Sequence, residues 1–132
     1  MAGNDKTFYH LEPVVMEGID SANMRDLSHL MYSYSIRSAG NPDLYQKFDA
    51  RMQTEDFSEL DYPTLFNLSF YSLFRESKDE AVWRKIVERA CAIEDVLPLV
   101  YYKSFKASFL YLKSVFPEWN LDLLGDKLWH AE

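Results

Sequence analysis

The chain has 132 residues, which suits one domain with a single hydrophobic core. Hydrophobic residues make up 48% of it, which excludes an intrinsically disordered chain, and four Gly with five Pro are too few for the tight turns of a β-sandwich. The net charge of -7 makes nucleic acid an unlikely partner, because binding to a phosphate backbone needs clustered Lys and Arg.

The sequence contains no membrane-spanning segment and no disulfide. No apolar run approaches the roughly 18 to 20 residues that a span requires, and the segment from Met1 to Lys6 lacks the apolar part of a signal peptide. The single cysteine, Cys91, excludes an intrachain disulfide. We expect membrane attachment only through a segment that is absent from this sequence.

Helix start and stop signals in the first half of the chain recur at short intervals, and no segment alternates as a strand does. A brief helix is expected near Phe8 to Met16. Ser21 is the expected N-cap of the next helix, and Gly40 suits its C′ position. Asn41 and Pro42 then read as the N-cap and first residue of a partner helix.

The second half of the chain has helix start and stop signals of the same kind. A short turn is expected from Asp56 to Leu60, and Asp61 begins the following helix. Ser77-Lys78-Asp79-Glu80 matches a capping box and predicts a helix that starts after Ser77. Pro98 opens another helix, and Pro117 closes that helix and begins the last one.

These signals predict an all-α chain of about seven helices in antiparallel hairpins. We expect a single helical domain over 1–132, with an N-terminal segment over 1–20 and hairpins over 21–52, 61–92 and 98–130.

A shift of 38 residues aligns the first long hairpin with the second. It places Leu27 on Leu65 and Arg51 on Arg89, and a shift of 37 carries the second copy weakly onto a third. Any antiparallel bundle gives apolar matches at its hairpin period. The matched Lys and Arg, which a core does not need, favour a short tetratricopeptide-like α-solenoid of about three hairpins. Solenoid and closed bundle both stay open.

The sequence offers little chemistry. The three histidines, His10, His29 and His130, are far apart and have no metal-ligand spacing. Paired carboxylates lie at predicted helix starts or in loops, where acids favour the helix dipole. We expect no enzyme activity, no catalytic residue, no cofactor and no metal.

Aromatic residues are the main candidates for function, since the chain has nine Tyr, nine Phe and three Trp. They either fill the hairpin interfaces with their hydroxyls at the rim, or form a protein-binding groove or dimer surface. The last helix also offers an apolar end that could form a homodimer. The partner-binding candidates are Tyr32, Tyr34, Phe70, Tyr71, Tyr101, Tyr111, Leu121, Leu124, Leu128 and Trp129.

One stretch has a net basic character. It contains Lys103, Lys106 and Lys113, which fall on roughly one helix. Such a stretch is most often a solvated face, and the alternative is contact with an acidic partner or with RNA.

The period near 38 and the Phe116-Pro117-Glu118-Trp119 element resemble the octotricopeptide and heptatricopeptide helical-repeat families, which implies organellar RNA binding. Tetratricopeptide repeats are a poorer match, because their period is about 34 residues.

In its size and helix number, and in segments such as Met24-Arg25-Asp26-Leu27 and Leu60-Asp61-Tyr62-Pro63, the chain also resembles the MIX family of membrane-anchored mitochondrial proteins of trypanosomatids. That resemblance implies a soluble domain of an inner-membrane scaffold associated with respiratory-chain assembly. A cytoplasmic location is the alternative.

Together these observations predict a non-enzymatic protein–protein interaction scaffold, steered by acidic rims such as Glu55 to Asp61. The alternative is an organellar RNA-binding helical repeat.

Overall fold

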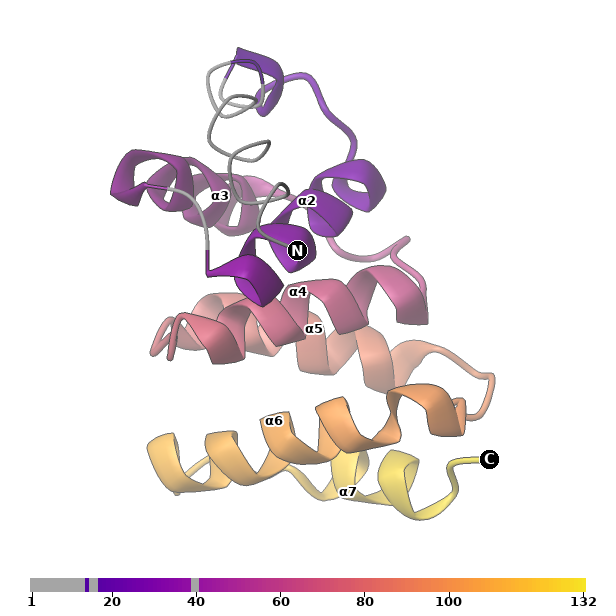
Figure 1. Cartoon of the computed structure of the whole chain (residues 1–132). Helices are drawn as coiled ribbons and strands as arrows, with labels where there is room; N and C mark the ends of the chain where they lie inside the picture. Colours follow the sequence, from indigo (N-terminus) through magenta and orange to yellow (C-terminus); the bar gives the residue numbers. More distant parts are fainter. Residues whose placement is uncertain (1–13, 15–16, 39–40) are drawn as a thin grey trace. The chain divides into compact units, whose positions relative to one another are not determined.

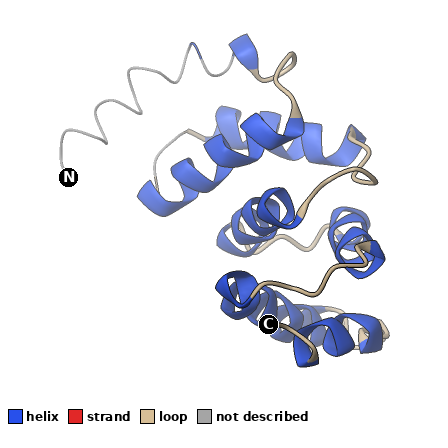
Figure 2. Cartoon of the chain, turned by 90° about the vertical axis from the view of Figure 1, so that its right-hand side faces the viewer, coloured by secondary structure: helices blue, strands red, loops and turns tan. Residues whose placement is uncertain are grey.

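The computed structural model describes residues 14, 17–38 and 41–132 (Figure 1). All regular structure in these residues is helical and none is a strand (Figure 2), which confirms the all-α prediction. The described residues form six α-helices where the sequence predicts about seven. The brief helix predicted near Phe8 to Met16 lies, apart from Val14, outside the described residues.

The chain divides into two compact units, Met1–Glu55 and Asp56–Glu132. The first contains α2 (Met24–Arg37) and α3 (Pro42–Thr54). The second contains α4 (Tyr62–Phe74), α5 (Glu80–Ala92), the 3₁₀ turn η1 (Leu99–Tyr101), α6 (Tyr102–Val115) and α7 (Asp122–Trp129). The single domain expected over 1–132 stays a prediction.

Helix α2 starts two residues later than the sequence predicts. Its N-cap is Asn23, whose side chain accepts a hydrogen bond from the Asp26 N–H at 2.8 Å. The Ser21 hydroxyl instead donates to the Gly18 carbonyl at 3.2 Å and closes the preceding turn. The helix ends at Arg37, and its C-cap, Ser38, has a left-handed φ of 47°. The predicted C′ residue, Gly40, lies outside the described residues.

Helix α3 begins as the sequence predicts. The Asn41 side chain accepts from the Leu44 N–H at 2.9 Å, and Pro42 is the first helical residue. Tyr34 of α2 and Phe48 of α3 are both buried, and their ring centroids lie 6.1 Å apart. Aromatic packing therefore joins the two helices of the first unit.

Helix α4 begins with Asp61 as its N-cap, in agreement with the prediction, and a turn precedes it from Phe57 to Leu60. Helix α5 is different, because its N-cap is Asp79 and not Ser77. The main chain of Ser77 belongs to the end of α4, since its N–H donates to the Ser72 carbonyl at 2.9 Å.

The Ser77 carbonyl accepts two further hydrogen bonds. The Trp83 indole N–H and the Tyr111 hydroxyl each donate to it at 2.9 Å. Trp83 is fully buried, and its ring lies 5.9 Å from that of Tyr111. Two aromatic residues from different helices thus fix the turn between α4 and α5.

The last helix also differs from the prediction. Pro98 does precede η1 and α6, but α7 begins at Asp122 and not at Pro117. The Trp119 N–H donates to the Phe116 carbonyl at 3.0 Å, and their rings pack edge to face. The Asn120 side chain then accepts from the Asp122 N–H at 2.9 Å, so the chain turns twice before the helix starts.

The four helices of the second unit pack around one core. Helix α4 contacts α5 and α6, and α7 contacts the same two helices (Figure 2). The fully buried apolar side chains of this core are Leu65, Leu68, Tyr71, Trp83, Ile86 and Leu112. The close packing of α7 on its neighbours sets which of its side chains reach the surface.

Residues 38 apart hold equivalent places in the α2–α3 and α4–α5 hairpins. Both of the described non-glycine residues with positive φ, Ser38 and Glu76, follow the first helix of their hairpin. The N-caps also correspond, Asn23 with Asp61 and Asn41 with Asp79. An arginine near the end of the second helix donates to a main-chain carbonyl just before the first: Arg51 to Ala22 at 2.8 Å, and Arg89 to Leu60 at 2.7 Å.

Candidate interaction surface

Five of the ten predicted partner-binding residues lie in the core. They are Tyr34, Tyr71, Leu121, Leu124 and Leu128, each at least nine-tenths buried. Leu124 and Leu128 lie on the face of α7 that packs against the rest of the second unit, and Leu121 is the residue just before this helix. Three of the four residues of the apolar end that the sequence predicts as a dimer surface are therefore covered within the unit, and Trp129, the fourth, is exposed.

Four further candidates are half-buried aromatic residues: Tyr32, Phe70, Tyr101 and Tyr111. The Tyr101 ring lies 5.2 Å from the ring of Phe66 on α4. The Tyr111 hydroxyl is engaged with the Ser77 carbonyl, and burial is the main cause that raises its pKa. Tyr101 and Tyr111 thus make contacts inside the second unit.

Trp129 is the one predicted candidate that is mostly exposed, and the connection between α5 and α6 also has exposed apolar residues. Its side chain is 84% exposed. Val96, Leu99 and Val100, in the connection between α5 and α6, are 47%, 61% and 78% exposed. We name Val96, Leu99, Val100 and Trp129 the C-terminal apolar cluster.

The main chain brings the two parts of the C-terminal apolar cluster to one end of the unit. The Leu99 N–H donates to the Glu132 carbonyl at 2.8 Å, and the Glu132 N–H donates to the Leu97 carbonyl at 3.0 Å. Residue 132 is therefore paired with 97–99, which places the end of α7 beside the start of α6 (Figure 1).

Lys127 fixes the same arrangement from within α7. Its ammonium group donates to the Asp95 carbonyl at 2.8 Å, to the Tyr62 hydroxyl at 2.7 Å and to the Ile93 carbonyl. A lysine of the last helix thus holds the α5–α6 connection in place. The C-terminal apolar cluster is a pre-organised surface, and binding to it costs less loss of conformational entropy than ordering a loop.

Acidic side chains surround the C-terminal apolar cluster in the sequence. Segments 93–101 and 126–132 contain four carboxylates, from Glu94, Asp95, Asp126 and Glu132, and all four residues are exposed. Lys127 is the only Lys or Arg of these two segments, and its ammonium group is bound to main-chain oxygens. Lys103, which is exposed one helical turn after Val100, adds one positive charge, so the charged residues beside the cluster are acidic on balance, and we call them its acidic rim.

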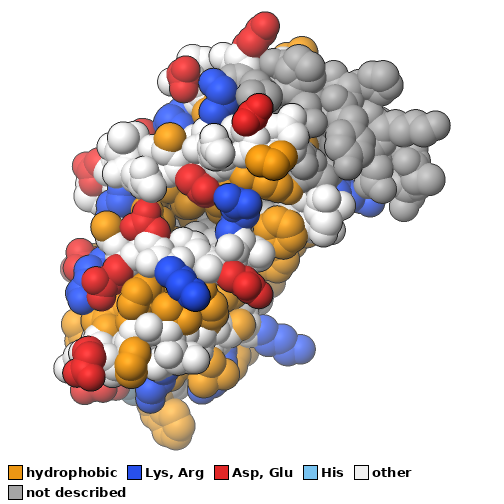
Figure 3. Space-filling model, turned by 90° about the vertical axis from the view of Figure 1, so that its left-hand side faces the viewer, with side chains coloured by type: hydrophobic (Ala, Val, Ile, Leu, Met, Phe, Trp, Pro, Cys, Tyr) orange, Lys and Arg blue, Asp and Glu red, His pale blue; other side chains and the backbone are white. Residues whose placement is uncertain are grey.

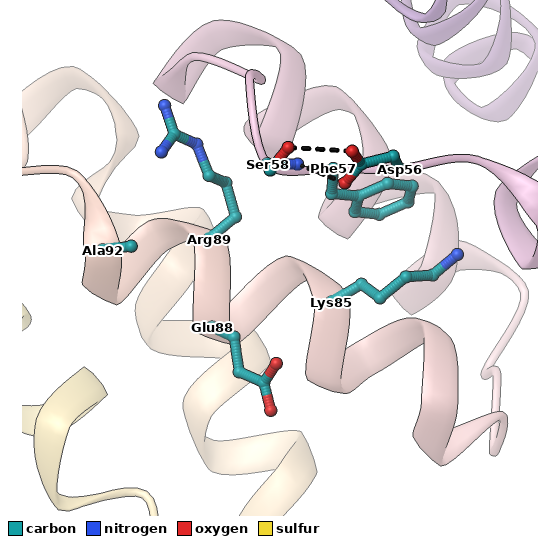
Figure 4. A pocket seen from close by; sticks show the side chains of 7 residues that line it. All are labelled: Asp56, Phe57, Ser58, Lys85, Glu88, Arg89 and Ala92. Atoms are coloured by element: carbon teal, nitrogen blue, oxygen red, sulfur yellow. Dashed lines mark hydrogen bonds between the residues drawn. The ribbon is translucent and has the colours of Figure 1, made fainter.

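A separate cavity of about 300 Å³ lies between the turn before α4 and the exposed side of α5 (Figure 4). The Lys85 ammonium lies 4.6 Å from the centre of the Phe57 ring, and Arg89 is held by the Leu60 carbonyl. The residues that line the cavity are Asp56, Phe57, Ser58, Lys85, Glu88, Arg89 and Ala92.

The charges of this cavity balance. The Ser58 N–H and hydroxyl both donate to the Asp56 carboxylate at 2.9 Å, and these hydrogen bonds lower the pKa of Asp56. Asp56 and Glu88 offset Lys85 and Arg89, and Figure 4 shows Glu88 directed away from the Asp56–Ser58 pair. The cavity therefore does not select a ligand by charge.

The basic stretch on α6 is partly covered by its own contacts. The ammonium groups of Lys106 and Lys113 lie 5.6 Å and 5.2 Å from the centre of the Phe109 ring. On the face drawn in Figure 3, Lys and Arg are scattered among acidic and hydrophobic side chains. Among the described residues drawn on that face, Lys and Arg form no continuous basic patch of the kind that binds nucleic acid.

Comparison of the chain with protein-family models, curated proteins and solved structures finds no match. Within the described residues, no helix combines the length and apolarity needed to cross a bilayer, and no three His, Cys, Asp or Glu side chains gather as metal ligands would.

Proposed function

We propose that this chain is a non-enzymatic protein-interaction module that binds its partner through the C-terminal apolar cluster. The observation that carries the proposal is the 84% exposure of Trp129, together with the pairing of residue 132 to 97–99, where Leu99 and the adjacent Val100 are also exposed. Tryptophan is among the residues that most often dominate binding energy, and exposed apolar patches mark interaction sites.

The one cysteine of the chain supports a non-enzymatic role. Burial is the main cause that raises the pKa of the Cys91 thiol, which is half-buried in α5. A raised pKa keeps the thiol protonated at neutral pH, and the protonated form is a poor nucleophile.

We also propose that the hairpins are copies of one repeat of 38 residues. The matched N-caps, the two left-handed residues and the two arginines support this, because they are polar or strained features that a core alone does not need. Lys127 follows Arg89 by 38 residues and likewise donates to main-chain carbonyls, those of Ile93 and Asp95. Helical repeats commonly serve as protein-binding scaffolds.

A mitochondrial scaffold associated with respiratory-chain assembly is the finer form of this proposal, and the resemblance to the MIX family is its support. Fractionation of source cells tests the compartment. Recovery of the protein with mitochondrial membranes would support it, and recovery in the cytosol would overturn it.

The interaction itself is tested by comparative affinity capture from source cells. The double variant Leu99→Ser/Val100→Ser removes the exposed apolar side chains of the connection. Leu110→Ser is the matched control, because Leu110 is 55% exposed on α6 and lies outside the C-terminal apolar cluster.

We expect the wild type and the Leu110→Ser control to capture the same protein, and the double variant to lose it while keeping its helical circular dichroism. Equal capture by all three folded proteins would contradict the proposed surface.

A further inference from the structure

We infer that the C-terminal apolar cluster binds a basic amphipathic helix, that is, a helix with an apolar stripe flanked by Lys and Arg. This inference rests on the proposed function and adds the chemical class of the partner. It follows from three properties of the surface. Its main-chain groups are already hydrogen-bonded, its apolar side chains come from two segments of the chain, and its rim is acidic.

The main chain of the surface does not offer a strand edge to a partner. The Leu97 carbonyl and the Leu99 N–H are already paired with Glu132. The Asp95 carbonyl accepts from Lys127 and from the Tyr62 hydroxyl, at 2.8 Å and 2.5 Å. A partner must therefore be recognised by side chains, which disfavours the addition of a β-strand.

The exposed apolar side chains come from two segments of the chain. Val96, Leu99 and Val100 lie in the connection before α6, and Trp129 lies at the end of α7. A helix presents apolar side chains at positions i, i+3, i+4 and i+7, and this stripe spans two neighbouring segments. An amphipathic helix is the secondary structure that fits such a surface.

The acidic rim selects the charge of that helix. Glu94, Asp95, Asp126 and Glu132 are exposed, whereas the Lys127 ammonium is bound to main-chain oxygens. Exposed Lys103, one turn after Val100, offsets one of these four carboxylates and leaves the rim with a net negative charge. The chain as a whole carries a net charge of -7. Lys and Arg beside the apolar stripe would meet these carboxylates, which speeds association and stabilises the complex.

The same rim disfavours a second copy of the chain as the occupant. In a two-fold symmetric dimer each surface meets itself, so the four carboxylates of one copy would face those of the other. Like charges placed opposite each other at an interface are destabilising. A basic partner has no such repulsion.

The test uses a synthetic helical peptide of about five turns, built from Leu and Lys with the leucines at i, i+3, i+4 and i+7. One control peptide has Glu in place of every Lys, and a second has the same composition with its leucines spread around the helix. Fluorescence anisotropy of the labelled peptide gives its affinity for the full chain.

Two protein variants separate the apolar and acidic contributions. We expect Leu99→Ser/Val100→Ser to weaken binding of the Leu/Lys peptide about thirty-fold, the size of one interface hot spot. We expect Asp126→Asn/Glu132→Gln to weaken it several-fold at low salt and less at high salt. Leu110→Ser and Glu118→Gln, both at exposed residues elsewhere in the unit, are the controls and should leave the affinity unchanged.

The inference would be overturned if the Leu/Lys peptide bound no more tightly than the Leu/Glu peptide. It would also be overturned if the Leu/Lys peptide bound no more tightly than the peptide with spread leucines. A dimer in analytical ultracentrifugation that is lost in Leu99→Ser/Val100→Ser would make a second copy the occupant and would also overturn it. Should the Leu/Lys peptide fail while capture from cells still depends on Leu99 and Val100, only the basic class of the partner is wrong and the proposed function stands.

Discussion

The α2–α3 hairpin of the first unit and the α4–α5 hairpin of the second keep the same polar contacts but differ in their apolar side chains. Both have capped starts, a left-handed residue after the first helix, and an arginine bound to the main chain before it. Their buried side chains differ, however, since Tyr34 corresponds to Ser72 and Tyr45 to Trp83.

This difference shows which contacts define a hairpin and which depend on its neighbours. The caps and the arginines bind main-chain groups of their own hairpin, so they are the same wherever the hairpin lies. The apolar side chains fill the space that other helices leave. Helix α4 packs against both α5 and α6, and small buried residues such as Ser69 and Ser72 suit that close packing.

The largest effect is expected at the aromatic position that differs between the hairpins. Trp83→Ala removes a fully buried ring and leaves the Ser77 carbonyl with one donor fewer, so we expect a loss of about 3–5 kcal/mol in the free energy of unfolding. Tyr45→Ala should cost about 2–3 kcal/mol, because Tyr45 is the smaller and slightly more exposed side chain.

Chemical denaturation checks this pair. Trp119 and Trp129 both lie in the second unit, so their emission follows its unfolding in the Trp83→Ala variant. Circular dichroism follows both units. A larger loss for Tyr45→Ala than for Trp83→Ala would show that the first hairpin is the more stabilising of the two.

The next effect concerns the shared arginines. Arg51→Met or Arg89→Met keeps much of the side-chain volume but leaves main-chain carbonyls without a donor, which should cost about 1–3 kcal/mol in each hairpin. Arg51→Met should cost more, because Arg51 also donates to the Ile19 carbonyl and pairs with Glu55 at 3.4 Å. The control is Lys103→Met, at an exposed residue, with a change within about 0.5 kcal/mol. Arginine variants as stable as that control would refute the shared role.

The two left-handed residues give a stabilising test. Ser38 and Glu76 have φ values of 47° and 49°, a conformation that costs a residue with a Cβ atom more than it costs Gly. We expect Ser38→Gly and Glu76→Gly each to raise the free energy of unfolding by about 0.5–1 kcal/mol. Thermal denaturation measures both. A decrease in either hairpin would show that the side chain there does more than tolerate the turn.

The smallest effect is on the reactivity of one thiol. Burial raises the pKa of Cys91, whereas its counterpart Gln53 is exposed in α3. A cysteine placed by Gln53→Cys in a Cys91→Ser background should therefore be alkylated several-fold faster near pH 8 than Cys91 in the wild type.

The raised pKa also has a consequence for stability. The folded chain holds the Cys91 proton to a higher pH than the unfolded chain does. The stability that this contributes is complete below the ordinary thiol pKa and is lost as the pH rises towards the folded value. In the alkylation experiment above, equal rates for the cysteine at position 53 and for Cys91 would contradict the difference in burial between the two positions.

The sequence predicts the helices better than their starts. Asn41 and Asp61 are caps as expected, because an Asx residue with Pro one or two positions later, in the first turn of the helix, is a strong local signal. Ser21 and Ser77 are not caps, because each belongs to the turn before its helix. Ser77 receives donors from α5 and α6, and this long-range effect cannot be read from a local motif.

The candidate surface was only partly predictable. Trp129 stands out because it is a large apolar residue near the end of an amphipathic helix. Val96, Leu99 and Val100, the other three residues of the C-terminal apolar cluster, are not among the residues predicted from the sequence. A signal did exist, since Val96-Leu97-Pro98-Leu99-Val100 is an apolar run within a connection. Leu121, Leu124 and Leu128 are as apolar as the residues of this run, but they are buried because α7 packs on α5 and α6.

Photo-crosslinking from position 129 in source cells tests whether the C-terminal apolar cluster binds another protein. A benzophenone amino acid replaces Trp129, and the same group in place of Leu110 is the control, since both side chains are exposed. The account predicts an adduct between position 129 and a different protein, with none at position 110. Absence of an adduct at position 129, or the same adduct from both positions, would contradict it.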